Sequence, residues 1–303
     1  MPIANQNTAK TFLLGVGAPK AGTTWLYKQL AKNPETTMGF LKEYHVFDAL
    51  TVPECEEFRT SAAQLFASRR SNPIRLLNPK VIRQLIRLKR RDRFYQDLGF
   101  YYAYFSGLLS QKNTILTGDI TPSYAGLPET TLASIRDGFE ARGIRIRVIY
   151  LMRDPVERCW SAVRMHRQNR FKIGHDNDLC VASEVDHLER SYRSDRFVLR
   201  GSYHKTIGRL RSVFAPEQVK IILYEDLFDD NTMKDIFQFL GLQERQVDTR
   251  HRVNATRKDI TLPVSLQSEI AHFYKDAYLA AAEEFSTEHL LSRWKSASFV
   301  LDT

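Results

Sequence analysis

The stretch TFLLGVGAPKAGTTWLYKQLAKNP, residues 11–34, decides the fold. Within it, Phe12 to Val16 is a short apolar run that ends at glycines, and this pattern predicts a buried parallel strand. Apolar residues then recur near helical spacing from Thr23 to Lys32, and Asn33-Pro34 ends that pattern, which predicts a helix. A strand, a tight glycine-rich turn and a helix are the opening of a nucleotide-binding α/β fold.

The turn Gly17-Ala18-Pro19-Lys20-Ala21-Gly22-Thr23-Thr24 has the composition of an anion site. Glycines let the backbone turn sharply and approach a ligand, and the free N–H groups of the turn and helix start attract negative charge. Lys20 adds a mobile positive charge. The Gly-x4-Gly spacing matches a Walker A loop, but Thr23 stands where that loop has lysine. This departure argues against an ordinary ATPase or GTPase, and a plain glycine turn is the structural alternative.

Three further apolar runs predict buried strands, and helical patterns separate them. The runs are Thr114 to Leu116, Ile144 to Leu151, and Val219 to Tyr224. The helical patterns run from Val156 to about Arg167 and from about Met233 to Leu240. We therefore expect an α/β, P-loop-like three-layer fold with a central, mostly parallel sheet flanked by helices.

The chain shows no internal repeat, no low-complexity tract and no clear linker. We therefore expect one domain over residues 1–303, with a helical insertion at about 52–109. That insertion carries a basic face, which is either a solvated helix surface or an electropositive lip for an anionic acceptor. The residues of this face are Arg83, Arg87, Lys89, Arg90, Arg91 and Arg93.

The balance of 44 Lys and Arg against 35 Asp and Glu gives a net charge of +9, which suits an anionic partner such as a nucleotide. A nucleic-acid partner is not expected, because positive residues also appear in the phosphate motifs themselves. Cys55, Cys159 and Cys180 form neither a disulfide framework nor a zinc pattern, and this favours reduced thiols in the cytoplasm. No stretch is apolar and long enough for membrane insertion.

A second motif follows the run that ends at Leu151 and reads Arg153-Asp154-Pro155. Pro155 suits the first turn of a helix, and Ser161 lies about two turns further on. An arginine fork and a serine hydroxyl are good ligands for a terminal phosphate. Taken alone, the motif is equally compatible with Asp154 capping a helix and Arg153 making a surface ion pair.

A third stretch, Lys42-Glu43-Tyr44-His45-Val46-Phe47-Asp48, follows a second predicted strand. In an extended chain Glu43 and His45 project to the same side. Group transfer to a hydroxyl needs a base for the acceptor proton and cations that stabilise the leaving charge. Glu43 can be the base, while Lys20 and His45 can supply the positive charge.

The first turn, extended to Pro19-Lys20-Ala21-Gly22-Thr23-Thr24-Trp25-Leu26, resembles the 5'-phosphosulfate-binding loop of PAPS-dependent sulfotransferases. These enzymes transfer a sulfuryl group from PAPS, 3'-phosphoadenosine-5'-phosphosulfate, and release PAP. The resemblance implies that Arg153 and Ser161 occupy the two ligand positions of the family's 3'-phosphate motif. It also implies that the 5'-phosphosulfate is held by Lys20, Ala21, Gly22, Thr23, Thr24 and Trp25.

Glu-x-His-x-Phe-Asp is similar to the catalytic stretch of the Golgi carbohydrate sulfotransferase branch, where the glutamate is the base. We therefore expect Glu43 to be the base, with His45 as its assistant and the alternative base. Asp48 is expected to orient His45 or to bind acceptor. The stretch Gly118-Asp119-Ile120-Thr121-Pro122-Ser123-Tyr124 resembles a further landmark of that branch, and it implies acceptor-pocket roles for Asp119 and Tyr124. Asp119 is equally compatible with a satisfied loop carboxylate.

Arg257 and Lys258 fall where the family has a basic loop, but no glycine stands beside them here. They are expected either to close over the nucleotide or to form an exposed basic turn. The resemblance as a whole implies sulfuryl transfer from PAPS, without a metal, to a hydroxyl or an amine of a small-molecule or carbohydrate acceptor. A P-loop kinase or NTPase acting on a small molecule is the alternative, and the oligomeric state stays open.

Overall fold

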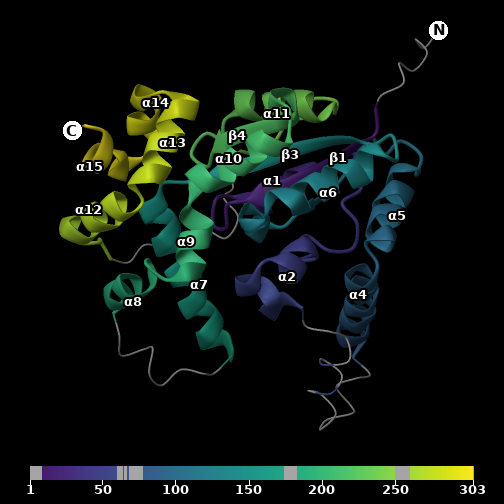
Figure 1. The fold of residues 1–303 in the computed structure, drawn as a ribbon, viewed down its shortest axis with the longest axis horizontal. Coiled ribbons are helices and arrows are strands. Elements are labelled where there is room, and N and C mark those ends of the chain that lie inside the picture. The colour runs from purple at the N-terminus through teal and green to yellow at the C-terminus, as the bar shows by residue number, and fades with distance from the viewer. Residues whose placement is uncertain are drawn as a thin grey trace.

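The computed structural model describes residues 9–59, 64, 67, 78–173, 183–249 and 260–302. Within them, four parallel strands pair in the order β2-β1-β3-β4 (Figure 1). The strands are β1 Thr11–Gly17, β2 Leu116–Ile120, β3 Arg145–Met152 and β4 Val219–Leu223. All residues of β1 and β2 are buried, so helices cover both faces of the sheet.

Helices surround the sheet, and Figure 1 shows α12 to α15 gathered on one side of the molecule with α4 and α5 on the opposite side. The α-helices are α1 Thr23–Ala31, α2 Phe47–Thr51, α4 Pro79–Gln96, α5 Leu98–Leu109, α6 Glu129–Glu140, α7 Pro155–Ile173, α8 Glu184–Ser191, α9 Asp195–Gly201, α10 Tyr203–Val213, α11 Asp230–Leu240, α12 Val264–Phe273, α13 Lys275–Phe285, α14 Thr287–Arg293 and α15 Ser298–Leu301. The 3-10 helices are η1 Pro53–Phe58, η3 Pro122–Gly126, η4 Pro216–Gln218 and η5 Lys295–Ala297.

The predicted fold class, a central parallel sheet flanked by helices, is confirmed. Strands β1, β3 and β4 lie where the apolar runs predicted them. Helix α11 ends at Gly241, whose φ of +73° is the left-handed conformation expected of a glycine cap. Aromatic packing joins α6 to the sheet, because the ring of Phe139 stacks on Phe12 of β1 with 3.8 Å between centroids.

Strand β2 differs from its prediction, because it extends to Ile120 beyond the apolar run that ends at Leu116. Its sequence, LTGDI, contains polar residues that hid it from a search for apolar runs. Thr117 and Asp119 are nevertheless fully buried. Their side chains are hydrogen-bonded, and the Thr117 hydroxyl donates to the carbonyl of Thr37 over 2.6 Å.

The second predicted strand, which was to precede Lys42, is wrong. Only an isolated bridge joins Thr36 to Leu116, and the chain then leaves the sheet. Gly39 turns it with φ +79°, and the N–H of Phe40 donates to the hydroxyl of Tyr44 over 3.1 Å. The N–H of Phe40 is thus satisfied by the hydroxyls of Tyr44 and Tyr104 and not by a neighbouring strand.

The basic face expected in the insertion lies mainly on α4. The side chains of Arg83, Arg87, Lys89, Arg90 and Arg93 are exposed, as the solvated-surface alternative requires. Arg91 is the exception, because it is buried and donates to the carbonyl of Phe58 over 3.0 Å. Arg257, Lys258 and Cys180 lie outside the described residues.

The strand order places a change of direction at β1, whose two neighbours, β2 and β3, lie on opposite sides of it. In open parallel sheets a crevice forms beyond the carboxyl ends of the strands at such a point, and ligands bind there. The turn after β1 opens into this crevice.

Candidate active site

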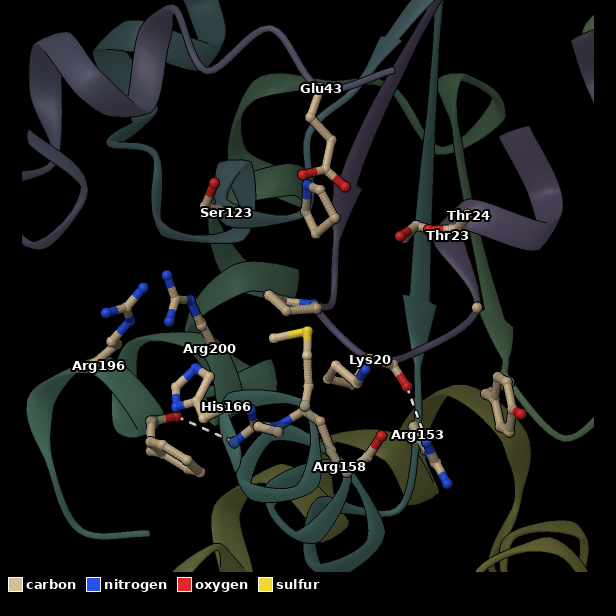
Figure 2. Close-up of a pocket in the computed structure, with 18 of the residues that line it drawn as sticks. Lys20, Thr23, Thr24, Glu43, Ser123, Arg153, Arg158, His166, Arg196 and Arg200 are labelled. Atoms are coloured by element: carbon tan, nitrogen blue, oxygen red, sulfur yellow. Dashed lines mark hydrogen bonds between the residues drawn. The ribbon is translucent and has the colours of Figure 1, made fainter. Parts of the chain in front are cut away.

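A cavity of about 600 Å³ lies beyond the carboxyl ends of the strands. The segment after each strand contributes a side chain to its lining: Lys20 after β1, Ser123 after β2, Arg153 after β3 and Tyr224 after β4. Figure 2 shows Glu43 and Ser123 at one end of the cavity and Thr23 and Thr24 along one side. Segments far apart in the sequence thus meet at one site.

Two glycines of the first turn are required by their conformation and surroundings. Gly17 has φ +136°, and a Cβ there would lie 2.5 Å from the carbonyl oxygen of Pro122. Gly22 has φ +87°, and a Cβ there would lie 2.7 Å from Cδ2 of Leu227. Substitution at either position would strain or displace the turn, so it is a built loop rather than a tolerant surface bend.

The turn presents unused hydrogen-bond donors to the cavity. Among the described residues, the backbone N–H groups of Gly22, Thr23 and Thr24 have no protein acceptor. Together with the two threonine hydroxyls they stand at the N-terminus of α1, where the helix dipole also favours an anion. Ala21 is fully buried, so only its backbone is available to a ligand. Trp25 lines the cavity while its ring packs on Phe228 at 5.0 Å.

Lys20 extends into the cavity from the middle of the turn (Figure 2). Burial lowers the pKa of its ammonium to about 8, and the positive charges of Arg153, Arg164 and Lys42 add to the effect. The lowered pKa means that burial and the neighbouring positive charges destabilise the charged form of Lys20. An anion in the cavity would stabilise that charged form.

The second predicted motif meets the first turn directly. Arg153 lines the cavity, and its guanidinium donates to the backbone carbonyl of Lys20 over 3.0 Å. It also pairs with Glu157 at 3.2 Å and lies over the ring of Tyr224. Ser161 lines the same cavity from α7.

Asp154 does cap α7, as the structural alternative for this motif proposed. Its carboxylate accepts from the N–H of Val156 over 3.0 Å and from the Tyr278 hydroxyl over 2.8 Å. The N–H of Ser296 donates to the second oxygen over 3.0 Å. The motif therefore combines a buried cap at Asp154 with a cavity-facing Arg153, and the two interpretations hold together.

Glu43 and His45 lie side by side at the end of the cavity, with 3.4 Å between Oε2 and Nε2. The extended chain expected here is wrong, because His45 has φ +51°. Their side chains meet through this left-handed turn instead. Lys42 makes an ion pair with Glu43, and the ring of Phe58 stacks on His45 with 3.9 Å between centroids.

The charges of this group are set by mutual pairing. Burial alone would raise the pKa of Glu43, but hydrogen bonds and charge from His45 and Lys42 outweigh it and lower the pKa to about 2. Burial alone would lower the pKa of His45, but Asp48 and Glu43 raise it to about 9. At neutral pH Glu43 is therefore a carboxylate and His45 an imidazolium.

A buried carboxylate, Asp119, holds the backbone of the Glu43 segment in place. It accepts from the hydroxyls of Thr121 at 2.6 Å, Tyr124 at 2.8 Å and Tyr101 at 3.0 Å. The hydroxyl oxygens of Thr121 and Tyr124 in turn accept from the backbone N–H groups of Tyr44 and Val46. The Asp119 stretch thus acts as a scaffold for the segment that carries Glu43.

The acceptor-pocket roles expected for Asp119 and Tyr124 need correction. They are 0% and 1% exposed and lie behind the cavity, where the satisfied-carboxylate alternative for Asp119 is realised. Asp48 is also 0% exposed. It accepts from His45 Nδ1 at 2.7 Å and from the Ser123 hydroxyl, so its geometry fits an orienting role and not acceptor contact.

The sequence interpretation missed part of the cavity lining. Arg158, Met165, His166, Arg196, Phe197 and Arg200 line it from α7 and α9. Arg158 lies within the Arg153–Ser161 stretch but was given no role, and no motif covers the other five residues, which come from two helices that meet only in the fold. Ser123 was quoted within a motif without a role, and it also lines the cavity.

In the described part of the chain, no group of three or more His, Cys, Asp or Glu side chains is placed to hold a metal ion. Among the helices described, none has both the length and the apolar character needed to cross a membrane.

Comparisons with known proteins agree with this architecture. Residues 141–279, which include β3 and the Arg153 motif, match the family model described as the sulfotransferase domain. The solved sulfotransferase from Alicyclobacillus acidocaldarius shares the fold, with a TM-score of 0.56, 19% identity, and coverage of 93% of this chain and 96% of that chain.

A second solved structure, the sulfotransferase domain of the Synechococcus PCC 7002 olefin synthase, has a TM-score of 0.46 and 17% identity. It covers 90% of this chain and 96% of that chain. No curated protein sequence matches the chain significantly. Residues 141–279 thus match a sulfotransferase domain, and the chain as a whole shares the fold of a solved sulfotransferase.

Proposed function

We propose that the protein transfers a sulfuryl group from PAPS to a hydroxyl of a small-molecule or carbohydrate acceptor, with PAP as the other product. The observation that carries this proposal is that two phosphate motifs, the turn ending at Gly22 and the Arg153–Ser161 pair, line one cavity. A ligand with phosphates at both ends of its ribose needs two such sites, whereas ATP needs only the first.

The donor side of the cavity is the segment from Gly17 to Trp25 together with Arg153 and Ser161. Its free N–H groups and threonine hydroxyls would hold the 5'-phosphosulfate. Arg153 and Ser161 would hold the 3'-phosphate through charge-assisted hydrogen bonds. Lys20 lies in the middle of the turn, where its charge would stabilise the oxygen that bridges phosphorus and sulfur.

The catalytic side of the cavity is lined by Glu43, His45 and Ser123, and the buried Asp48 and Asp119 support it from behind. In the transfer, the acceptor oxygen forms a bond to sulfur while the bond from sulfur to the bridging oxygen of PAPS breaks. The acceptor proton passes to Glu43, and the electron pair of the broken bond leaves with PAP. Lys20 and the His45 imidazolium offset the charge that develops on the leaving oxygen.

The protonation states favour Glu43 over His45 as the base. His45, with a pKa of about 9, holds its proton at neutral pH and can donate but not accept. Glu43 is ionised, although its ion pair with Lys42 makes it weakly basic. An anionic donor that attracts Lys42 away from Glu43 would make the carboxylate more basic as the site fills.

Nucleotide protection against thermal unfolding tests the proposal. PAP should raise the unfolding temperature without magnesium, and ATP with or without magnesium should raise it much less. The P-loop kinase or NTPase alternative predicts the opposite order, with protection by magnesium and ATP. Transfer of labelled sulfate from PAPS then tests catalysis.

The buried free thiols of Cys55 and Cys159 support the cytoplasm as the site of action.

A further inference from the structure

The wall of the cavity formed by α7 and α9 is strongly basic. Arg158 and His166 line it from α7, and Arg196 and Arg200 line it from α9. Figure 2 shows Arg196 and Arg200 on the side of the cavity away from Thr23 and Thr24. We call these four residues the basic wall. They are separate from the donor side, whose cations among the described residues are Lys20 and Arg153.

The positive charge of the basic wall is poorly compensated. Arg196 pairs with Glu57 at 2.5 Å. Arg200 makes no ion pair with any described residue, and its buried Nε has no hydrogen-bond partner among them. Burial lowers the pKa of Arg200, and the charge of Arg196 adds to the effect. Among the described residues, Glu57 is thus the carboxylate that acts on both of these guanidinium groups.

Arg158 adds a third guanidinium, and it is only 1% exposed. Its Nη2 donates to the carbonyl of Phe197 and to the Cys159 sulfur, both at 3.1 Å, while its Nε has no partner among the described residues. Neither partner is a carboxylate. Buried charges are normally paired, because removing an ion from water without a counter-charge is costly.

The pKa of His166 is sensitive to the positive charge of the basic wall. Burial lowers its pKa, and the charges of Arg196 and Arg200 lower it further. A neutral acceptor would bring no counter-charge to these groups and would strip water from them. An acceptor with an oxyanion would replace that water with charge-assisted hydrogen bonds.

We propose that the acceptor carries an oxyanion, a carboxylate or a phosphate or sulfate monoester, which Arg196 and Arg200 bind while its hydroxyl faces Glu43. This inference rests on the proposed function, because it assigns the substrate class of the same site. The basic wall selects the acceptor, and the donor side binds PAPS independently.

The test uses matched acceptors, each assayed for transfer of labelled sulfate from PAPS. The panel holds hydroxy carboxylates of increasing length, each beside its primary amide, and hydroxyalkyl phosphates beside their neutral methyl diesters. The expected result is a preference for the charged member of a pair in kcat/KM by about tenfold or more. Whichever charged series, the carboxylates or the phosphates, reacts with the higher kcat/KM shows which oxyanion the basic wall binds.

The variant Arg200→Met should reduce that preference about tenfold and leave PAP affinity unchanged. Arg87→Gln, which removes one exposed charge from α4, is the matched control and should keep the preference. Neutral acceptors that react as well as charged ones, or a preference that survives Arg200→Met, would overturn the proposal.

A binding measurement covers the case in which no panel member is turned over. The His166 ring is followed by NMR in the PAP-saturated protein as each pair is added. The charged member should raise the pKa of His166, and the neutral member should not; a pKa unmoved by every charged member overturns the inference. Failure of PAP to bind would instead contradict the proposed function itself.

Discussion

The two sides of the cavity differ in whether their polar groups have hydrogen-bond partners within the described protein. On the donor side, the N–H groups of Gly22, Thr23 and Thr24 have no acceptor among the described residues. On the catalytic side, Glu43 and His45 are already bonded to each other and to their neighbours. The donor side is thus ready for an anion, whereas the catalytic side must exchange internal partners before it can act.

Each side also depends on one buried aspartate. Asp154 holds the start of α7, from which Arg153 and Ser161 reach the cavity, and Asp119 holds the segment that carries Glu43. Burial raises the pKa of both carboxyls, to about 6 for Asp119, and the hydrogen bonds that each accepts work against that shift. The two sides can therefore be perturbed separately through equivalent substitutions.

The largest expected effect is on the catalytic side, at Glu43. Glu43→Gln should lower kcat about 10²- to 10⁴-fold, because the amide cannot accept the acceptor proton. PAP affinity should be retained, since the donor side is untouched. Single-turnover transfer and calorimetric PAP binding measure the two quantities, with Glu54→Gln on the exposed surface of η1 as the control. A parallel loss of PAP binding would assign Glu43 a structural role.

The second effect compares the two buried aspartates. Asp119→Asn should leave a hydroxyl donor unsatisfied, lower the free energy of unfolding by about 1–3 kcal/mol, and reduce kcat while sparing PAP affinity. Asp154→Asn should cost similar stability but weaken PAP binding. Denaturant unfolding, PAP titration and the split between kcat and KM distinguish them. If both variants lose PAP affinity equally, the two sides are not independent.

The smallest effect concerns pH on the donor side. Lys20 has a pKa of about 8, so its charge is lost as the pH rises through that value. PAP affinity should therefore fall above pH 8, by up to about tenfold per pH unit until the raised pKa of the bound state is reached. Lys20→Arg keeps its charge and should flatten this dependence. An unchanged slope in that variant would show that another group titrates.

The contrast between the two sides also explains what could be predicted from the sequence. The donor side is made by short contiguous segments whose glycines and helix starts have local physical requirements, so Gly22, Thr23 and Arg153 could be placed on one sheet edge in advance. The catalytic side depends on hydroxyl bonds between segments distant in sequence. Asp119 and Tyr124 therefore resembled pocket residues although they lie behind it.

The basic wall could not be predicted for a related reason. Arg196 and Arg200 lie one turn apart on α9, in a stretch with no motif, and an arginine pair on a helix is usually a solvated surface. Only the fold turns them toward the cavity. The His45 turn escaped prediction as well, because a positive φ is uncommon for a residue other than glycine.

We propose that both phosphate motifs bind one doubly phosphorylated adenosine. Calorimetric titration of the wild type and Arg153→Ala with PAP and with AMP, which differ only in the 3'-phosphate, is the decisive experiment. Arg153→Ala should weaken PAP to about the affinity of AMP, a loss of roughly 2 kcal/mol or more, and leave AMP binding unchanged. Equal losses for the two ligands, or none for either, would contradict it.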